Sequence, residues 1–259
     1  MQVIGVQLDI EWENKAANHA KVQALLSRTA IRPGALIVLP EMFATGFSMS
    51  VSQIEDSRTE QTLHFLTELA QAHQAYVLAG IVSKSSSGRG RNEAVLINPE
   101  GRPIARYQKL HPIPMADEDK HYEPGEKIIT FAWHGFTVAP MICYDVRFPE
   151  VFRQATKRGT DVFIVIANFP ALRESHWIAL LIARAIENQA YVIGVNRCGD
   201  DPSHHYSGRS LIVDPRGEVI ADGGNDESIV TADLDTSDLA DYRASFPALK
   251  DMRFVSDDR

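Results

Sequence analysis

The sequence has few cysteines, no excess of basic residues and no long apolar run, and each absence excludes a class of protein. Two cysteines in 259 residues are too few for a disulfide framework and lack the paired spacing of a structural zinc site. The 26 lysines and arginines are outnumbered by 34 aspartates and glutamates, giving a formal charge of −8, which argues against binding to nucleic acid or to an anionic membrane. No apolar stretch approaches the roughly 18 residues of a membrane span. The N-terminus lacks the charged lead and the cleavage site of a secretion signal, so we expect a cytoplasmic protein.

Motifs for metals and phosphates are also missing. The nine histidines include no His-Glu-x-x-His pair, which would place two zinc ligands on one helix face. No glycine-rich loop ends in Gly-Lys-Ser or Gly-Lys-Thr. The sequence therefore predicts neither a metal ion nor an organic cofactor.

Short, almost continuously apolar runs recur along the chain and predict strands that are covered on both faces. Between several of them, around residues 22–26, 63–70 and 177–185, apolar side chains recur at helical spacing. The runs cover residues 35–39, 76–82, 136–142, 162–167 and 191–195. Because strand and helix alternate and no Ser-, Gly- or Pro-rich linker divides the chain, we expect one α/β domain over residues 1–259.

Two segments of the chain resemble each other. Residues 95–105 and 211–221 each contain Asn or Asp, then Pro, then Gly two positions later, between strand-like arms. This order is typical of a type I turn and predicts two hairpins. The recurrence indicates two related halves that share one core, although the match is too short to prove a duplication. The polar stretch from about residue 235 to 259 is interpreted as a C-terminal arm that lies on another surface.

Several predicted strands end at a reactive side chain. In open α/β sheets such residues gather at the carboxyl ends of the strands, and Glu41, Cys143 and Asn168 each follow an apolar run, while Lys109 follows the first hairpin. Each has an ordinary structural explanation: Cys143 as a small core residue, Glu41 as a helix cap, Lys109 as a surface lysine. Together they form a chemical set, because a nucleophilic thiol needs a base and a tetrahedral intermediate needs a cation near its oxygen.

Three motifs carry a resemblance to a known family. The segments LPEMF at 39–43, YQKLH at 107–111 and ICYDVRFPE at 142–150 resemble the signature motifs of the nitrilase superfamily of carbon–nitrogen hydrolases, in the same order and along essentially the whole chain. The resemblance implies a four-layer α-β-β-α sandwich, a homodimer, and catalysis by Glu41, Lys109 and Cys143. It also implies a second glutamate seven residues before a Pro-Gly glycine, which points to Glu118 before Gly125, although Asp117 and Asp119 are close rivals by position.

Within the superfamily the sequence is most similar to the omega-amidase branch, which releases ammonia from the side-chain amide of 2-oxo acids such as 2-oxoglutaramate and 2-oxosuccinamate. We expect Glu41 to act as the base, Cys143 to form a thioester, and Lys109 and the backbone N–H of Tyr144 to hold the oxyanion. We expect Asn168 and Phe169 to contact the substrate as well. Phe169 stands where many relatives have Trp, which leaves the shape of the pocket open. Because the protein is acidic, an anionic substrate needs a local cation, and Arg173 is our candidate.

Other functions remain open at this stage. The motif CYDxRFPE is shared with a branch that hydrolyses deaminated glutathione, and hydrolysis of carbamoyl amines is a further alternative. A Cys–His hydrolase or acyltransferase would pair Cys143 with His111, His121 or His176. A scaffold that only binds or assembles would need no reactive thiol.

Overall fold

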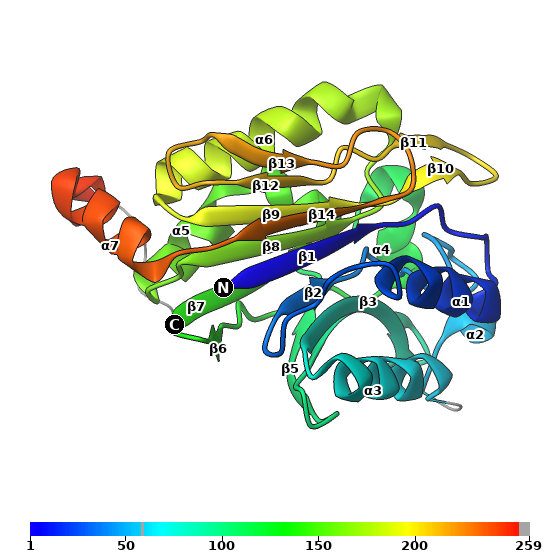
Figure 1. Cartoon of the computed structure of the whole chain (residues 1–259). Coiled ribbons are helices and arrows are strands. Elements are labelled where there is room, and N and C mark those ends of the chain that lie inside the picture. The colour runs from blue at the N-terminus through cyan, green and yellow to red at the C-terminus, as the bar shows by residue number, and fades with distance from the viewer. Residues whose placement is uncertain (58–59, 254–259) are drawn as a thin grey trace.

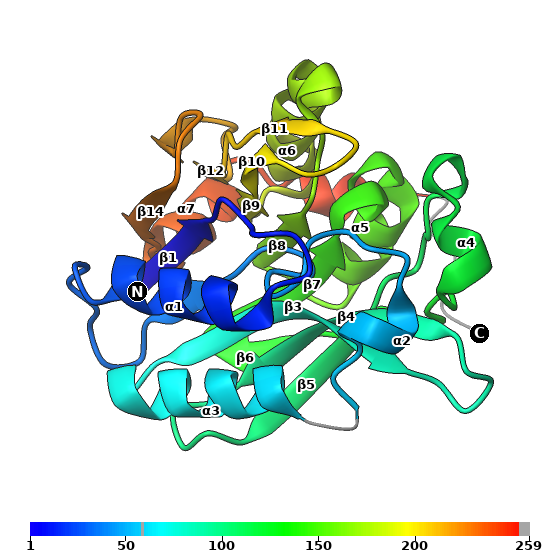
Figure 2. The same cartoon turned by 90° about the vertical axis from the view of Figure 1, so that its right-hand side faces the viewer.

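Two six-stranded sheets lie face to face between two layers of helices, in the computed structural model that describes residues 1–57 and 60–253 (Figures 1 and 2). The first sheet has the order β14-β1-β2-β3-β4-β5 and the second has the order β13-β12-β9-β8-β7-β6. Helices α1 and α3 cover the outer face of the first sheet, and α5 and α6 cover that of the second. The predicted four-layer α-β-β-α sandwich is confirmed.

The strands are distributed as follows. The first sheet contains β1 (Gln2–Gln7), β2 (Leu36–Val38), β3 (Tyr76–Lys84), β4 (Gly90–Ile97), β5 (Pro103–Gln108) and β14 (Ser228–Asp233). The second contains β6 (Phe131–Trp133), β7 (Phe136–Ile142), β8 (Val162–Ala167), β9 (Tyr191–Asn196), β12 (Leu211–Val213) and β13 (Val219–Asp222). A separate hairpin pairs β10 (Cys198–Asp200) with β11 (His205–Ser207). All five predicted strand runs are confirmed, with ends within two residues of those expected.

The helices follow the predicted periodic stretches. The three predicted helical stretches correspond to α1 (Lys15–Leu26), α3 (Gln61–His73) and α6 (Glu174–Asn188). The structure contains in addition α2 (Val51–Ile54), α4 (Glu118–His121), α5 (Pro149–Lys157) and α7 (Thr236–Ser245). Short 3₁₀ turns are η1 (Pro114–Ala116), η2 (Cys143–Arg147), η3 (Ala171–Arg173) and η4 (Ala248–Asp251). The described part of the chain contains no helix that could serve as a membrane span.

The central strands are apolar along their whole length because both of their faces are buried. In the first sheet Val3, Leu36 and Leu78 face the second sheet, whereas the neighbouring Ile37 and Val77 face α1 and α3. Alternation along a strand sends successive side chains to opposite faces. A strand between a helix layer and another sheet therefore has no polar face, which explains the uninterrupted apolar runs in the sequence.

The two sheets share one topology. In the first sheet the parallel strands β1, β2 and β3 are followed by the antiparallel strands β4 and β5. In the second sheet the parallel strands β7, β8 and β9 are followed by the antiparallel strands β12 and β13. Both hairpin turns close with the backbone hydrogen bond that is typical of a β-turn. The N–H of Gly101 donates to the carbonyl oxygen of Asn98 at 2.8 Å, and the N–H of Gly217 donates to the carbonyl oxygen of Asp214 at 3.0 Å. The two hairpins are confirmed, and their common topology supports the interpretation of two related halves.

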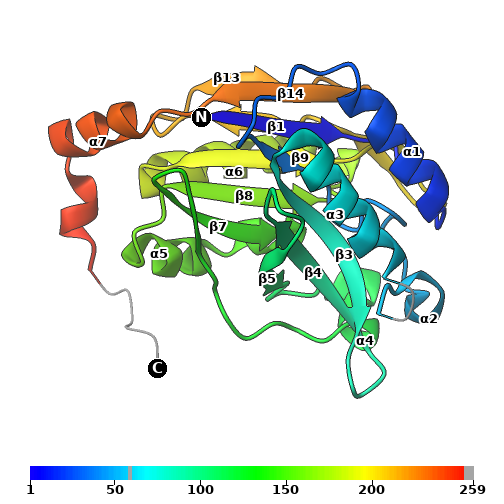
Figure 3. The same ribbon diagram turned by 60° about the horizontal axis from the view of Figure 1, so that its bottom comes forward.

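The C-terminal arm begins with α7, which lies at one end of the molecule (Figure 3). Arg243 ties this helix to the body of its own chain, because its guanidinium contacts the Asp161 carboxylate at 2.5 Å and the carbonyl oxygens of Thr160 and Gln189 at 2.8 and 2.9 Å. The arm continues through η4, and its last part, residues 254–259, lies outside the described residues.

Candidate active site

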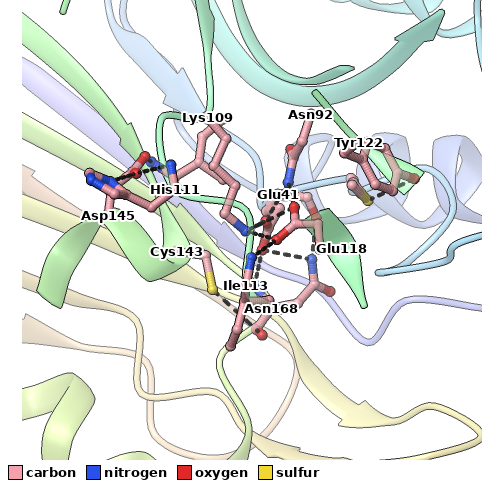
Figure 4. A network of polar contacts seen from close by, with 12 residues as sticks. Glu41, Asn92, Lys109, His111, Ile113, Glu118, Tyr122, Cys143, Asp145 and Asn168 are labelled. Carbon is pink, nitrogen blue, oxygen red and sulfur yellow. Dashed lines mark hydrogen bonds and ion pairs between the residues drawn. The ribbon is translucent and has the colours of Figure 1, made fainter. Parts of the chain in front are cut away.

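Four predicted side chains converge at the carboxyl ends of the strands (Figure 4). Glu41 lies in the turn after β2, and Lys109 directly follows β5. Cys143 is the first residue of η2, immediately after β7, and Glu118 is the first residue of α4. The structure thus brings together side chains that are up to 102 positions apart in the sequence (143 − 41).

Lys109 lies between two carboxylates. Its Nζ is 2.9 Å from Glu41 Oε1 and 2.9 Å from Glu118 Oε2. The lysine side chain is 1% exposed and both glutamate side chains are 0% exposed. Burial disfavours the charged ammonium, but the carboxylates of Glu118 and Glu41 outweigh it and hold the pKa of Lys109 well above its ordinary value. Lys109 is therefore a fixed cation next to Cys143.

Glu118 accepts hydrogen bonds from several groups at once. Besides Lys109, the backbone N–H of Ile113 donates to Oε2 at 2.7 Å and the side-chain amide of Asn92 donates to Oε1 at 3.0 Å. Burial raises the pKa of Glu118 above its ordinary value, while the ammonium of Lys109 opposes that shift and Glu41 adds to it. A buried carboxylate with these partners has no freedom to turn away from the lysine.

The two acidic neighbours of Glu118 face solvent instead. Asp117 pairs with Lys120 at 2.8 Å on the surface, and Asp119 is exposed. Neither contacts Lys109, so of the three rival positions only Glu118 lies in the cluster.

The turn after β2 fixes the direction of Glu41. Met42 has a φ of +45°, a left-handed conformation that is costly for a residue with a side chain. The neighbouring strand β3 leaves room for this sharp turn because its Gly80 has no Cβ. A Cβ at Gly80 would lie 2.5 Å from the Cα of Glu41. The backbone N–H of Asn168 donates to Glu41 Oε2 at 2.8 Å, and the amide of Asn92 donates to Oε1 at 2.7 Å.

Cys143 sits at a second strained turn, with a φ of +45°. Its Sγ lies 3.8 Å from the carbonyl oxygen of Asn168. Burial raises the pKa of the thiol well above its ordinary value, the carboxylate of Glu41 raises it further, and the ammonium of Lys109 opposes the shift. The shift favours the protonated thiol, so a nucleophilic role for this sulfur would need a neighbouring base to remove its proton.

Asp145 joins the turn of Cys143 to the loop of Lys109. Its buried carboxylate accepts hydrogen bonds from the hydroxyl of Tyr107 at 2.7 Å and from the backbone N–H of His111 at 3.0 Å. The same carboxylate lies 2.8 Å from Nδ1 of His111. Asp145 lies two residues after the cysteine, whereas Tyr107 and His111 lie two residues before and after the lysine. One carboxylate thus links the turn of Cys143 to the loop of Lys109, and it occupies Nδ1 of His111.

The residues predicted to contact substrate lie on η2 and on the segment after β8. Tyr144 is in the first turn of η2, where backbone N–H groups have no partner within the turn. The backbone N–H of Phe169 donates to Asn196 at 2.7 Å, and the guanidinium of Arg147 lies 5.2 Å from the centre of the Phe169 ring. Arg173 is half-buried in η3. Within the described residues, neither arginine forms an ion pair with a carboxylate.

Sequence reasoning missed Asn92, Asp145 and Asn196 as supports of the site. Asn92 and Asn196 are each 1% exposed. Asn196 ends an otherwise apolar strand, where a buried polar side chain must find a partner, so the sequence carried a signal for it. Asn92 stands between Arg91 and Glu93 on β4, and the sequence carried no such signal there. For Asp145 the signal was its place inside the cysteine motif.

Two hollows of the surface lie away from these residues. One of about 320 Å³ is lined by residues such as Asn14 and Gln53, and one of about 380 Å³ by residues such as Arg91 and Lys127. In the described parts of the chain, no group of three or more His, Cys, Asp or Glu side chains is arranged to hold a metal ion. The buried ionisable cluster is therefore the feature that distinguishes this site from the rest of the surface.

The chain is similar to known hydrolases in sequence and in structure. A family profile described as carbon-nitrogen hydrolase matches residues 5–244. The 2-oxoglutaramate amidase of Bacillus subtilis (strain 168) is 33% identical over 96% of this chain and 96% of its own length. Omega-amidase YafV of Yersinia enterocolitica is 38% identical over 95% and 94% of the two chains.

Two further proteins extend the comparison. A deaminated glutathione amidase of Synechocystis is 35% identical over 87% of this chain and 89% of its own. The crystal structure of a CN-hydrolase superfamily protein from Xanthomonas campestris, with an arsenic adduct in its active site, has a TM-score of 0.93 at 30% identity and covers 100% of this chain and 99% of its own.

Proposed function

The chain belongs to the carbon-nitrogen hydrolase family, and we propose that it is a thiol amidohydrolase that releases ammonia from the ω-amide of small 2-oxo acids such as 2-oxoglutaramate and 2-oxosuccinamate. The observation that carries this proposal is the contact of Glu41 and Lys109 beside the thiol of Cys143. The branch is supported by relatives of 33% and 38% identity that are named 2-oxoglutaramate amidase and omega-amidase.

Glu41 acts as the general base and then as the general acid. Because burial holds the pKa of Cys143 high, the sulfur attacks the amide carbon while its proton passes to the carboxylate of Glu41. The protonated carboxyl then gives the proton to the departing nitrogen, which leaves as ammonia, and a thioester remains on Cys143. Glu41 next takes a proton from water as the water oxygen attacks the thioester carbon. When the C–S bond breaks, Glu41 returns that proton to the sulfur, and the acid product loses its own proton to solvent and leaves as the carboxylate.

The negative charge that forms on the substrate oxygen is stabilised by Lys109 and by the backbone N–H of Tyr144. The ammonium of Lys109 is held in place by two carboxylates, so it does not need to reorganise when the charge develops. Loss of one such donor typically lowers turnover by roughly 10²–10³-fold.

A cation near the pocket receives the carboxylate of the 2-oxo acid. Arg173 follows the segment of Asn168 and Phe169 and forms no ion pair in the part of the chain that the structure describes. Arg147 is a second candidate, since its guanidinium lies on the ring of Phe169 and also lacks a carboxylate partner among the described residues. Either arginine would offset the net charge of −8 near the substrate.

Hydrolysis of deaminated glutathione is the second candidate function. It is favoured by the 35% identity to a deaminated glutathione amidase and by the motif CYDVRFPE, which does not separate the two branches. Hydrolysis of carbamoyl amines uses the same catalytic groups and is the third. A Cys–His enzyme is less compatible with the geometry, because Nδ1 of His111 is held by Asp145 and both His121 and His176 are exposed.

An ammonia-release screen tests these functions directly. The purified protein is offered 2-oxoglutaramate, 2-oxosuccinamate, deaminated glutathione, glutamine and carbamoyl amines. We expect the two 2-oxo acid amides to have the highest kcat/KM, and activity to be lost in Cys143→Ala but kept in the matched variant Cys198→Ala. A ranking headed by deaminated glutathione or carbamoyl amines would overturn the branch. Full activity of Cys143→Ala would overturn the thioester mechanism.

The location of the protein and its assembly stay predictions. We propose a cytoplasmic homodimer, on the resemblance to the superfamily alone. Size-exclusion chromatography with light scattering distinguishes a dimer from a monomer of 28.8 kDa.

A further inference from the structure

Asn92 contacts both buried carboxylates of the site with one amide group. It lies on β4, is 1% exposed, and its Nδ2 is 2.7 Å from Glu41 Oε1 and 3.0 Å from Glu118 Oε1. Its backbone oxygen also accepts the N–H of Lys109 at 2.9 Å. Asn92 and Lys109 are thus two neighbouring donors that hold the same pair of carboxylates (Figure 4).

These donors make the two oxygens of Glu41 unequal. Oε1 accepts two close hydrogen bonds, from Lys109 at 2.9 Å and from Asn92 at 2.7 Å. Oε2 accepts one close bond, from the backbone N–H of Asn168 at 2.8 Å, and a long contact of 3.4 Å from the side chain of the same residue. The carbonyl oxygen of Asn168 is in turn 3.8 Å from the Sγ of Cys143. The oxygen with free acceptor capacity is therefore the one beside the residue that contacts the thiol.

We propose that Asn92 is a positioning residue that, together with Lys109, occupies Oε1 of Glu41 and so makes Oε2 the oxygen that takes and returns the catalytic proton. This inference rests on the proposed function, since it assumes that Glu41 is the base for Cys143. The S–H bond breaks as the sulfur electron pair forms the C–S bond, and the proton moves to Oε2. When the C–N bond breaks, the nitrogen takes that proton and leaves as ammonia.

Only one orientation of the Asn92 amide is compatible with this network. Its Oδ1 is buried and has no hydrogen-bond partner in the described residues. Exchange of the nitrogen and the oxygen would place Oδ1 against two carboxylates and repel both. The donor also favours the ionised form of Glu118, because the hydrogen bond from Asn92 opposes the rise in the pKa of that carboxyl. Asn92 thereby keeps the counter-charge of Lys109 in place.

Two variants of Asn92 test the role. In Asn92→Ala the loss of a donor to a charged group is expected to lower kcat by about 10- to 100-fold. KM should change little, because Asn92 is not expected to contact substrate. The acid limb of the kcat profile should move to higher pH, since Glu118 loses a donor that favours its ionised form.

Asn92→Asp keeps the shape of the side chain and exchanges the donor for a titratable oxygen. While the introduced carboxyl is protonated it can donate to one carboxylate. When it ionises it repels both, so kcat should fall as pH rises, which is the opposite trend to Asn92→Ala. This variant also keeps the proposal testable if Asn92→Ala does not fold.

A matched control separates positioning from general stability. Glu93 is the next residue on β4, is 4% exposed, and directs its carboxylate away from the site, to Arg106 at 2.7 Å and to Ser83 at 2.5 Å. Glu93→Gln is expected to leave kcat and the pH profile unchanged. If both Asn92 variants keep the wild-type kcat and pH profile while Cys143→Ala is inactive, the role of Asn92 is wrong and the proposed function stands. If Cys143→Ala is active, the proposed function itself is wrong.

Discussion

Replacement of Glu41 by Gln separates the proposed mechanism from a Cys–His enzyme. The substitution keeps the size of the side chain and removes its negative charge. All the groups around Glu41 are donors: Lys109 and Asn92 on Oε1, and the backbone N–H of Asn168 on Oε2. The amino group of Gln therefore opposes a donor whichever way it turns. At least one hydrogen bond is lost in either orientation: the bond from Asn168 if the NH2 group takes the place of Oε2, or the bonds from Lys109 and Asn92 if it takes the place of Oε1.

The expected loss of activity follows from two contributions. A positioned general base accounts for about 10²–10⁴ in rate. The hydrogen bond that the glutamine amino group cannot accept contributes about 1.5–3 kcal/mol, or roughly 10- to 100-fold. The two effects act through one side chain and are not additive, so we expect kcat/KM of Glu41→Gln to fall by at least about 10³-fold.

Steady-state ammonia release measures this loss between pH 5 and 9, with the best substrate of the screen. Circular dichroism confirms that the variant is folded, and Glu93→Gln serves as a control for removal of another buried carboxylate. His121→Ala and His176→Ala should retain full activity. Retention of more than a tenth of kcat/KM in Glu41→Gln, or its loss in either histidine variant, would refute the assignment of Glu41 as the base.

Three further results are expected. Arg173→Ala should raise KM for a 2-oxo acid amide by about 10- to 100-fold without changing kcat; a rise only in Arg147→Ala would move the carboxylate site to that residue, and no change in either would exclude both. Cys143 should be alkylated by iodoacetamide before Cys198, because Cys143 is partly exposed and lies beside the carboxylate of Glu41, whereas Cys198 is 2% exposed; the reverse order in peptide mass spectrometry would contradict a base beside Cys143. Burial lowers the pKa of His19 from 6.5 to about 4, so below pH 6.5 the unfolded chain binds a proton that the folded protein does not, and stability falls toward pH 4. Urea unfolding at pH 7 and pH 4.5 should show that His19→Phe removes this loss, roughly 2 kcal/mol after a discount for partial screening by solvent; an equal acid sensitivity in both proteins would contradict it.

The strands that the apolar runs predicted are those whose faces are both buried, whereas the outer strands of the hairpins were predicted from their turns. Residues 162–167 read as a continuous apolar run because β8 lies between α5, α6 and the first sheet. Strands at or near the sheet edges carry a weaker signal. In β14 the residues alternate in exposure, and its partner is β1, more than 220 positions away in the sequence. That pairing depends on the whole chain having folded, so no local pattern could predict it.

The sequence predicted those site residues that follow a buried strand. Glu41 and Cys143 follow buried parallel strands, and the rule for strand ends places such residues at one edge. The identity of the second carboxylate was not settled in this way, because three acidic residues occur in a row and only burial distinguishes Glu118. Asn92 lies within a strand and contacts the site through the direction of its side chain. Such contacts follow from tertiary packing, which the sequence does not display.

In the proposed mechanism, the charge of the buried cluster explains why proton transfer and nucleophilic attack would occur together. With both carboxylates ionised, Glu41, Glu118 and Lys109 carry a net charge of −1. A preformed thiolate at Cys143 would add a second negative charge in a site of low dielectric, and the raised pKa of the thiol reflects that cost. When the proton moves to Glu41 as the sulfur attacks, one negative charge disappears from the carboxylate and one appears on the substrate oxygen. The net charge stays constant, and the charge only moves past the same ammonium of Lys109. Because that ammonium is already held by Glu118, the site stabilises the transition state without creating a new buried charge.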